Sequence, residues 1–506
     1  MNRIIAYSLL LIAIIFAVWY STTHVDAPSL FDDDTQYMQN ALAFSTGHFT
    51  QGTGNILSLR LMMSIPMAVS YLVLGYTPLA SAMWDIVSFI GSIIVAFLIG
   101  RELFDEYVGA AAALLLAFIP QVALLATSAD DAIPLMFLSA LVMLCLTAGR
   151  KRNYWQAYLL AGALLVADML VSPLGFIMLL LATAYVAWDY FFSKKIPLTC
   201  AAWFLAGIAI AGIVLTAFNY YTSMDPVITL KGYAGFYSTY KNIGIALNFD
   251  PSFYFWVLFN FSSPGNGGYG PGSFYILALI PSIAYIAWRR KRHAEIPIIW
   301  FGFVLTYIAI GPMSITLNPL AYYLIPGVWR YVSLIAVPMA LLIAIALVGA
   351  MRELLKLYRS GKAYVMLALV ALLALVAMLI LDSFGNVLIL YHGDISLLAN
   401  SRELGAYLSV LPSNSMIYIS AAMPYALTFA SLYSNARIGI SDVRLISSTP
   451  TCTSVANASY VVLPESWAKS ADVSSSYASP CINWTEAFSI SGYATVYYTG
   501  SAARPK

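Results

Sequence analysis

Eleven apolar segments, most of them about 20 residues long, constrain this chain more than any other feature, because a bilayer core roughly 30 Å thick requires helices of that length. With 61% hydrophobic and 9% charged residues, the 506-residue chain lies outside the range of soluble globular proteins. The sequence predicts a polytopic α-helical membrane protein with about 11 transmembrane helices. The segments are 4–20, 79–100, 108–127, 132–149, 155–171, 173–192, 197–221, 273–288, 296–312, 331–351 and 363–381.

A further apolar segment, 59–75, contains Arg60 and Pro66 and decides the topology. If it lies along the interface instead of crossing, 15 of the 25 Lys and Arg residues fall on the side of the N-terminus. The positive-inside rule assigns that side to the cytoplasm, whereas a crossing segment would break the pattern. We therefore expect a cytoplasmic N-terminus and an external C-terminal region, in a plasma membrane or, in a eukaryote, an ER-type membrane. The net charge of +2 gives no indication of a nucleic-acid partner.

The hydropathy divides the chain into two predicted domains. Residues 1–388 form a transmembrane module with long outer loops at 21–78 and 222–272. Residues 389–506 become rich in Ser and Thr and predict a small soluble α/β domain. We expect helices at 397–411 and 425–433 and strands at 417–420, 460–463 and 495–498.

Sequons and cysteines in the predicted outer regions are a second indication that these regions are external. Glycosylation sequons begin at Asn260, Asn457 and Asn483, all on the predicted outer side. A disulfide between Cys452 and Cys481 would require an oxidising compartment, and the alternative is two free thiols.

Three consecutive acids, Asp32, Asp33 and Asp34, follow the first apolar segment. The simplest role is to cap a helix that begins at Asp34 or Thr35 and turns Tyr37 toward the membrane, but one acid would suffice for capping. Three adjacent carboxylates repel one another and raise the pKa of at least one, which suits a general base.

Other polar residues beside apolar segments are candidates for the same site. Asp130 and Asp131 either cap the next helix or face the acidic triplet. Arg330 lies beside an apolar segment, where it either extends to the interface or binds a phosphate, and Arg60 offers a second guanidinium. Asp168, within an apolar segment, needs a partner or a pocket. Interfacial Tyr37 and His48 are further pocket candidates.

Several of these residues lie in motifs that resemble one family. Residues 33–37 with 41–49, then 103–109, and then Asp130-Asp131 are similar to the outer loops and first cytoplasmic turn of the GT-C glycosyltransferases. The protein O-mannosyltransferase and aminoarabinose-transferase branch is the most similar, and Asp34 stands where that branch usually has Glu. The similarity covers residues 1–200 best.

The resemblance implies a GT-C fold and an inverting hexosyltransferase, which transfers a sugar from a polyprenyl-phosphate donor to an acceptor on the outer face. The acceptor would be a lipid-linked glycan, a protein hydroxyl or a surface lipid, and the sequence does not choose among them. Asp33 would act as the base with Asp34 and Asp131 in support, and Arg330 and Arg60 would hold the donor phosphate. Tyr37, His48 and Asp130 would line the pocket. Some GT-C enzymes use a divalent metal, and Mg²⁺ or Mn²⁺ would here bind Asp33 and Asp131.

Two readings from other classes remain open. A transporter or flippase would use intramembrane acids as ion relays, and this chain instead gathers its acids near one surface. A catalytically inactive relative would use the same fold as a scaffold.

Overall fold

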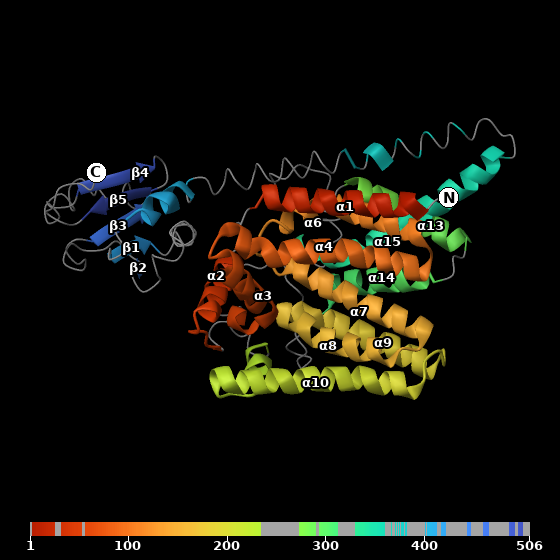
Figure 1. Cartoon of the computed structure of the whole chain (residues 1–506), viewed down its shortest axis with the longest axis horizontal. Coiled ribbons are helices and arrows are strands. Elements are labelled where there is room, and N and C mark those ends of the chain that lie inside the picture. The colour runs from red at the N-terminus through yellow and green to blue at the C-terminus, as the bar shows by residue number, and fades with distance from the viewer. Residues whose placement is uncertain are drawn as a thin grey trace.

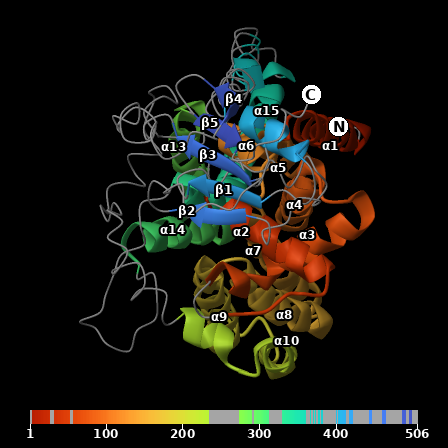
Figure 2. The ribbon, with the colours of Figure 1, turned by 90° about the vertical axis from the view of Figure 1, so that its left-hand side faces the viewer.

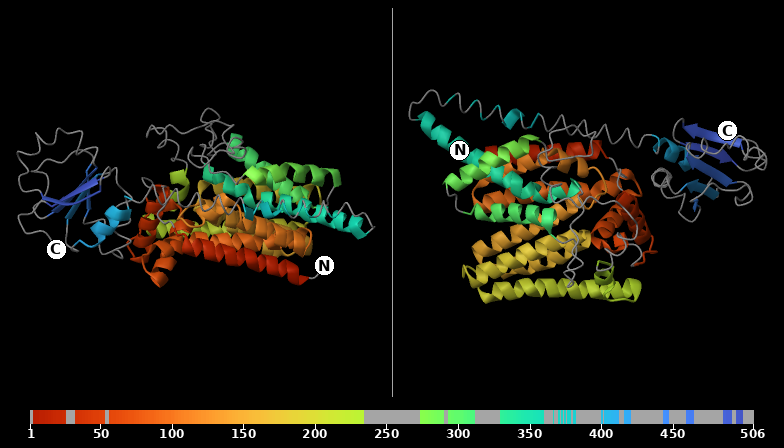
Figure 3. Two further views of the ribbon diagram at one scale, coloured as in Figure 1. Left: turned by 90° about the horizontal axis from the view of Figure 1, so that it is seen from above. Right: turned by 180° about the vertical axis from the view of Figure 1, so that it is seen from behind.

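The computed structural model describes residues 3–25, 32–52, 56–233, 273–289, 293–311 and 329–359, scattered helical residues between 366 and 381, residues 400 and 402–411, and five strands within 416–498. Most of the long helices pack side by side in one bundle with their axes roughly parallel, and the strands form a separate sheet (Figure 1). Views from above and from behind show the same arrangement (Figure 3). The molecule is a multi-pass helical membrane protein.

Six helical segments of the described residues are long and apolar enough to cross a membrane. They are α1 (Arg3–Thr23), α4 (Pro78–Leu103), α7 (Ala132–Arg152), the turn η2 (Pro173–Gly175) with α9 (Phe176–Phe191), α10 (Leu198–Ser223), and the turn η5 (Trp329–Ile335) with α15 (Ala336–Arg359). Shorter apolar helices are α3 (Leu61–Leu74), α5 (Glu106–Ala117), α8 (Trp155–Val171), α13 (Ser273–Arg289) and α14 (Glu295–Ile310).

Two predicted segments differ from the observed helices. The segment 108–127 is broken after Phe118 into α5 and α6 (Pro120–Leu125), because Pro120 cannot donate a backbone hydrogen bond to a continuing helix. Helix α15 runs on to Arg359 instead of ending near residue 351. Of the segment 363–381, only scattered helical residues are described.

Helix α3 covers most of segment 59–75 and shows whether that segment is long enough to cross the bilayer. It has 14 residues, which span roughly 21 Å at 1.5 Å per residue and fall short of a bilayer core. Its last turn contacts the start of α4, where the Tyr71 and Ser81 hydroxyls are 2.9 Å apart. Both ends of α3 therefore lie at the same end of the bundle, beside α2 (Asp32–Ser45) (Figure 1).

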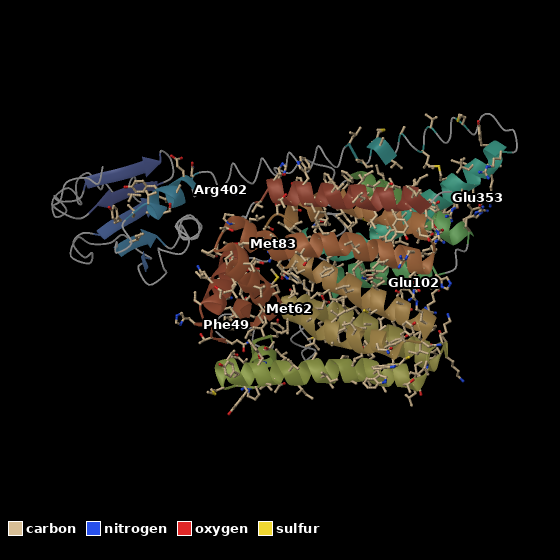
Figure 4. All side chains as sticks on the ribbon, in the orientation of Figure 1. Phe49, Met62, Met83, Glu102, Glu353 and Arg402 are labelled. Atoms are coloured by element: carbon tan, nitrogen blue, oxygen red, sulfur yellow. The ribbon has the colours of Figure 1, made fainter. Side chains whose placement is uncertain are left out.

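The opposite end of the bundle, here called the basic end, holds the lysine and arginine clusters. Arg152 pairs with Glu102 at 3.3 Å and Arg352 with Asp105 at 2.8 Å, while Arg3 pairs with Glu106 at 3.5 Å. Figure 4 labels Glu102 and Glu353 at this end, and Met62 and Phe49 at the other. The sequence correctly predicted that these basic residues share one side.

Glycines allow a close contact between α8 and α10. A Cβ atom at Gly162 of α8 or Gly207 of α10 would collide with the facing backbone carbonyl of Phe204 or Leu159. Small residues let membrane helices approach in this way and gain dispersion contacts. This contact fixes α10 against α8 although most of α10 is exposed.

The C-terminal strands form one mixed sheet in the order β2-β1-β3-β5-β4. Strand β1 lies between β2 and β3 and is parallel to both, while β5 is antiparallel to β3 and β4 (Figure 2). Predicted strands 417–420, 460–463 and 495–498 lie within β1, β3 and β5, and residues 402–409 are helical. The strands are β1 (Met416–Ser420), β2 (Val443–Ile446), β3 (Ser459–Pro464), β4 (Thr485–Ile490) and β5 (Ala494–Tyr498).

Some predictions fall on residues outside the described ranges. These are the second helix at 425–433, the three sequons and the Cys452–Cys481 disulfide. The other two cysteines, Cys145 and Cys200, are free thiols in the bundle.

Candidate functional site

Helix α2 carries the acidic triplet and starts at Asp32, two residues earlier than expected. Asp33 and Tyr37 are four residues apart and so share one face of the helix. Tyr37 and Met38 are fully buried in the protein core, which corrects the expectation that Tyr37 faces the membrane. The buried Arg60 side chain donates a hydrogen bond to the Tyr37 hydroxyl and holds it inside the protein.

Arg330, in the turn η5 before α15, binds two of the acids at once. Its Nη2 atom donates to Asp33 Oδ2 at 2.7 Å, and its Nη1 atom donates to Asp130 Oδ2 at 2.7 Å. Its Nε atom lies 3.8 Å from Asp131 Oδ1. A planar guanidinium fork is suited to such multiple binding of carboxylates. Arg330 therefore joins the first loop of the chain to the loop before α7.

Arg60, at the start of α3, forms a second bridge. Its Nη1 atom donates to Asp131 Oδ2 at 2.7 Å and to the Tyr37 hydroxyl, and lies 3.9 Å from Asp33 Oδ2. Its guanidinium carbon is 5.7 Å from the centre of the Tyr37 ring. We call Asp33, Asp130, Asp131, Arg60, Arg330 and Tyr37 the Asp–Arg cluster, and its end of the bundle the acidic end.

Asp33 is the one carboxylate of the Asp–Arg cluster that is partly exposed. The side chain of Asp33 is 24% exposed, whereas those of Asp130 and Asp131 are 0% exposed. Burial alone would raise the pKa of Asp33, but the Arg330 and Arg60 guanidinium groups hold it below its usual value. Asp33 is thus an ionised, accessible carboxylate that is held by Arg330.

Asp130 has two roles in the same place. Its Oδ1 atom accepts a hydrogen bond from the Ala132 backbone N–H at 2.8 Å and so caps α7, while its Oδ2 atom binds Arg330. Both readings of the Asp130-Asp131 pair therefore hold for Asp130. Burial, opposed by Arg330 and assisted by the neighbouring Asp131, raises the pKa of Asp130 to about 6.

Asp85 is a member of this region that the sequence analysis missed. It is fully buried in α4 and interacts electrostatically with Asp130, Asp34 and Asp131. Asp34 is also fully buried and does not reach the surface as Asp33 does. The sequence did contain a signal for Asp85, because it is an acid inside the apolar segment 79–100. Such an acid is costly in a membrane unless it has a function or a partner.

Two other candidates lie apart from the Asp–Arg cluster. His48 follows the end of α2 and is exposed, and the helix from Asp33 to Ser45 is roughly 18 Å long at 1.5 Å per residue. Asp168 of α8 accepts from the Ser139 hydroxyl of α7 at 3.1 Å, so its buried charge has a local partner. The structure therefore gives Asp168 a packing role between two helices.

The cluster does not fit a resident divalent ion. Among the described residues, no three His, Cys, Asp or Glu side chains are arranged to hold a metal. Arg330 and Arg60 occupy the positions beside Asp33 and Asp131 that a cation would need. Two guanidinium groups neutralise the carboxylates in this arrangement.

The helical arrangement is that of known membrane glycosyltransferases. The crystal structure of ArnT from Cupriavidus metallidurans bound to undecaprenyl phosphate matches with a TM-score of 0.62 at 11% identity, over 100% of both chains. The chain has the GT-C fold. The Archaeoglobus fulgidus oligosaccharyltransferase in its apo form shares this GT-C fold, with a TM-score of 0.56 at 13% identity over 91% of this chain and 70% of that one.

A protein-family model also matches part of the helical bundle. Residues 61–214 match the family model of dolichyl-phosphate-mannose-protein mannosyltransferases. No curated protein sequence matches the chain. A further GT-C structure, the archaeal oligosaccharyltransferase AglB from Archaeoglobus fulgidus with an inhibitory peptide and a dolichol-phosphate, matches 85% of this chain and 63% of that one at 15% identity, with a TM-score of 0.54. The predicted GT-C resemblance is confirmed.

Proposed function

We propose that this protein is a glycosyltransferase that moves a sugar from a polyprenyl-phosphate donor to a hydroxyl group of a lipid or protein acceptor. The observation that carries the proposal is the ion pair between Asp33, the accessible carboxylate, and Arg330. One residue has the properties of a base and the other those of a phosphate ligand, and they lie 2.7 Å apart. The GT-C fold and the mannosyltransferase family match support the same chemistry.

The pair suggests how donor binding prepares the base. The phosphate of the sugar donor, when it binds the Arg330 guanidinium, competes with Asp33 for the same N–H groups. Released from Arg330, the Asp33 carboxylate loses the contact that lowers its pKa and becomes a stronger base. Arg60, 3.9 Å from Asp33, offers a second contact for the phosphate and keeps Asp131 neutralised meanwhile.

The reaction is then a single displacement with inversion. The acceptor oxygen bonds to the anomeric carbon as its proton passes to the Asp33 carboxylate. The bond from the anomeric carbon to the phosphate oxygen breaks, and polyprenyl phosphate leaves with the electron pair. Guanidinium groups beside the leaving phosphate stabilise this charge as it develops. Asp130, Asp131 and Tyr37 position the two arginines, and Asp34 adds negative charge behind them.

The location of the site in the membrane is part of the proposal. The basic end faces the cytoplasm by the positive-inside rule, so the Asp–Arg cluster and the C-terminal sheet lie outside. Segment 363–381 then supplies the crossing that returns the chain to the outer side and completes about eleven spans. The segregation of lysine and arginine clusters at the basic end supports this topology.

Sugar transfer in proteoliposomes tests the function directly. Radiolabelled polyprenyl-phosphate hexoses are supplied with a lipid and protein extract, and the rate of transfer is compared between wild type and Asp33→Asn. Removal of a general base should lower the rate by roughly 10²- to 10⁴-fold. The matched control is Asp225→Asn, an acid that pairs with Lys231 at 2.7 Å outside the cluster and should transfer at the wild-type rate.

Two outcomes would count against the proposal. Wild-type protein that transfers no sugar from any donor would favour the scaffold reading, or the transporter reading if intact lipid crosses the bilayer. Transfer by Asp33→Asn at the rate of wild type and Asp225→Asn would remove Asp33 from the role of base.

A further inference from the structure

A concave site lies at the basic end of the bundle, away from the Asp–Arg cluster. It is a crevice of about 360 Å³ between α7, α9 and α14, a volume typical of small-ligand sites. Two of its lining residues, Trp188 of α9 and Ile299 of α14, are 59% and 55% exposed on the outer surface of the bundle. The α9/α14 crevice is therefore open sideways, toward the lipid that surrounds these helices.

Its lining changes from charged to apolar with depth. Along α14 the lining residues run from Glu295 at the basic end through Trp300 to Phe303. Along α9 they run from Asp189 to Leu181 in the same direction, away from the basic end. A molecule with a charged head at the membrane surface and an apolar chain within the bilayer has the same gradient.

Two cations stand at the charged end. Arg150 is fixed by Asp189, whose Oδ2 atom lies 3.1 Å from its Nε, and by a 2.9 Å hydrogen bond from Nη1 to the Tyr185 hydroxyl. Within the described ranges, no hydrogen bond or ion pair of its Nη2 atom is seen, which leaves that atom for a ligand. Lys195 lines the same crevice and a neighbouring one of about 370 Å³, and forms no ion pair with any residue in the described ranges.

A buried hydrogen-bond donor lies deeper in the crevice. Trp300 is 1% exposed, lines the crevice, and its indole N–H has no acceptor among the residues that the structure describes. It lies five residues from Glu295, roughly 7.5 Å along the helix at 1.5 Å per residue. A buried N–H without an acceptor is costly, so a ligand acceptor at this depth would stabilise it.

We propose that the α9/α14 crevice binds a glycerophospholipid from the leaflet that meets the basic end. The phosphodiester binds Arg150 and Lys195, a glycerol ester carbonyl accepts the hydrogen bond of Trp300, and an acyl chain lies along Leu181, Ile299 and Phe303. The site is independent of the proposed transfer reaction.

The chemistry of the crevice distinguishes this lipid from a polyprenyl phosphate. The crevice also contains the acids Asp189 and Glu295, which favour a singly charged phosphodiester over a doubly charged phosphate monoester. A polyprenyl phosphate has no ester carbonyl for Trp300. Both differences favour a glycerophospholipid.

Native mass spectrometry of the full chain in mild detergent tests the site, with phosphatidylglycerol and undecaprenyl phosphate as alternative probes. In Lys195→Ala, we expect the affinity for phosphatidylglycerol at one site to fall roughly tenfold, as for a lost charge-assisted contact. Lys194→Ala is the matched control, since Lys194 is the adjacent exposed lysine and lines neither crevice. Trp300→Phe keeps the ring, removes the N–H and should also weaken binding.

The outcome separates the alternatives. Weaker phosphatidylglycerol binding in Lys195→Ala and Trp300→Phe, but not in Lys194→Ala, supports the site. Equal binding by wild type, Lys195→Ala and Trp300→Phe would overturn it. Stronger retention of undecaprenyl phosphate than of phosphatidylglycerol, lost in Lys195→Ala, would replace the glycerophospholipid with a carrier lipid. Sugar transfer should be unchanged in Lys195→Ala, so this result does not depend on the proposed reaction.

Discussion

Arginine–carboxylate pairs occur at both ends of the bundle, but their surroundings differ. At the basic end, Arg152 pairs with Glu102 while its side chain remains 52% exposed. At the acidic end, the Arg330 side chain is 8% exposed and binds Asp33 and Asp130, with Asp131 nearby. Water screens the first pair, whereas the second loses hydration and depends on its partners. The same residue types therefore form partly exposed pairs at one end of the bundle and a buried cluster at the other.

Loss of Arg330 should produce the largest effect. In Arg330→Ala, the buried Asp130 and the neighbouring Asp33 lose their main cation, and an uncompensated buried charge costs about 3–5 kcal/mol of the free energy of unfolding. We expect a large fall in the thermal unfolding temperature in detergent and no detectable sugar transfer. A near wild-type unfolding temperature would show that water already solvates the cluster.

Loss of Arg60 should have an intermediate effect that separates binding from chemistry. Arg60→Gln keeps a polar group near Tyr37 but removes the charge beside Asp131. A lost hydrogen bond to a charged group is worth about 1.5–3 kcal/mol, so we expect KM for the donor to rise roughly tenfold or more. Steady-state kinetics at several donor concentrations measures this, with Lys231→Gln as an exposed control. A change in kcat alone would place Arg60 outside the phosphate site.

The raised pKa of Asp130 predicts a smaller effect that depends on pH. The pKa rises from 3.8 to about 6 on folding, so the folded state binds this proton more tightly than the unfolded state. The resulting stabilisation is present at low pH and is lost as the pH rises toward 6. Asp130→Asn should remove this part of the pH dependence, measured as unfolding temperature between pH 4 and 7 in wild type and variant. If the unfolding temperature of Asp130→Asn depends on pH as in wild type, another group causes this pH dependence.

The smallest effect is expected at the basic end. Arg152→Ala removes a solvated pair with Glu102, which also pairs with Lys151, and should change the free energy of unfolding by less than about 1 kcal/mol. The thermal unfolding temperature measures this against Arg330→Ala. A similar loss in both variants would remove the distinction between the two ends.

The sequence was most informative where the membrane imposes a simple rule. Apolar length located most helices, and charge placed segment 59–75 at one end of the bundle, where α3 lies. The break at Pro120 could have been anticipated from proline geometry. Motif order and spacing identified the GT-C fold, because that signal does not depend on a single residue.

Contacts between distant segments were harder to predict. The sequence supplied Asp33, Arg60, Asp131 and Arg330 as candidates but not the pairing of Asp33 with Arg330, because hydropathy contains no information on which loops meet. It placed His48 in the pocket, whereas the length of α2 separates it from Asp33. It overlooked Asp85, whose surroundings depend on how α4 packs beneath the loop before α7.

The ion pairs of Arg330 also constrain the biogenesis of the protein. Arg330 is 297 residues from Asp33 and 200 residues from Asp130 along the chain. A ribosome therefore delivers these acids to the membrane long before it makes their cation, and the nascent bundle must hold them hydrated or protonated until then. Truncated products that end before residue 330 retain uncompensated acids, so we expect membrane quality-control proteases to remove them selectively.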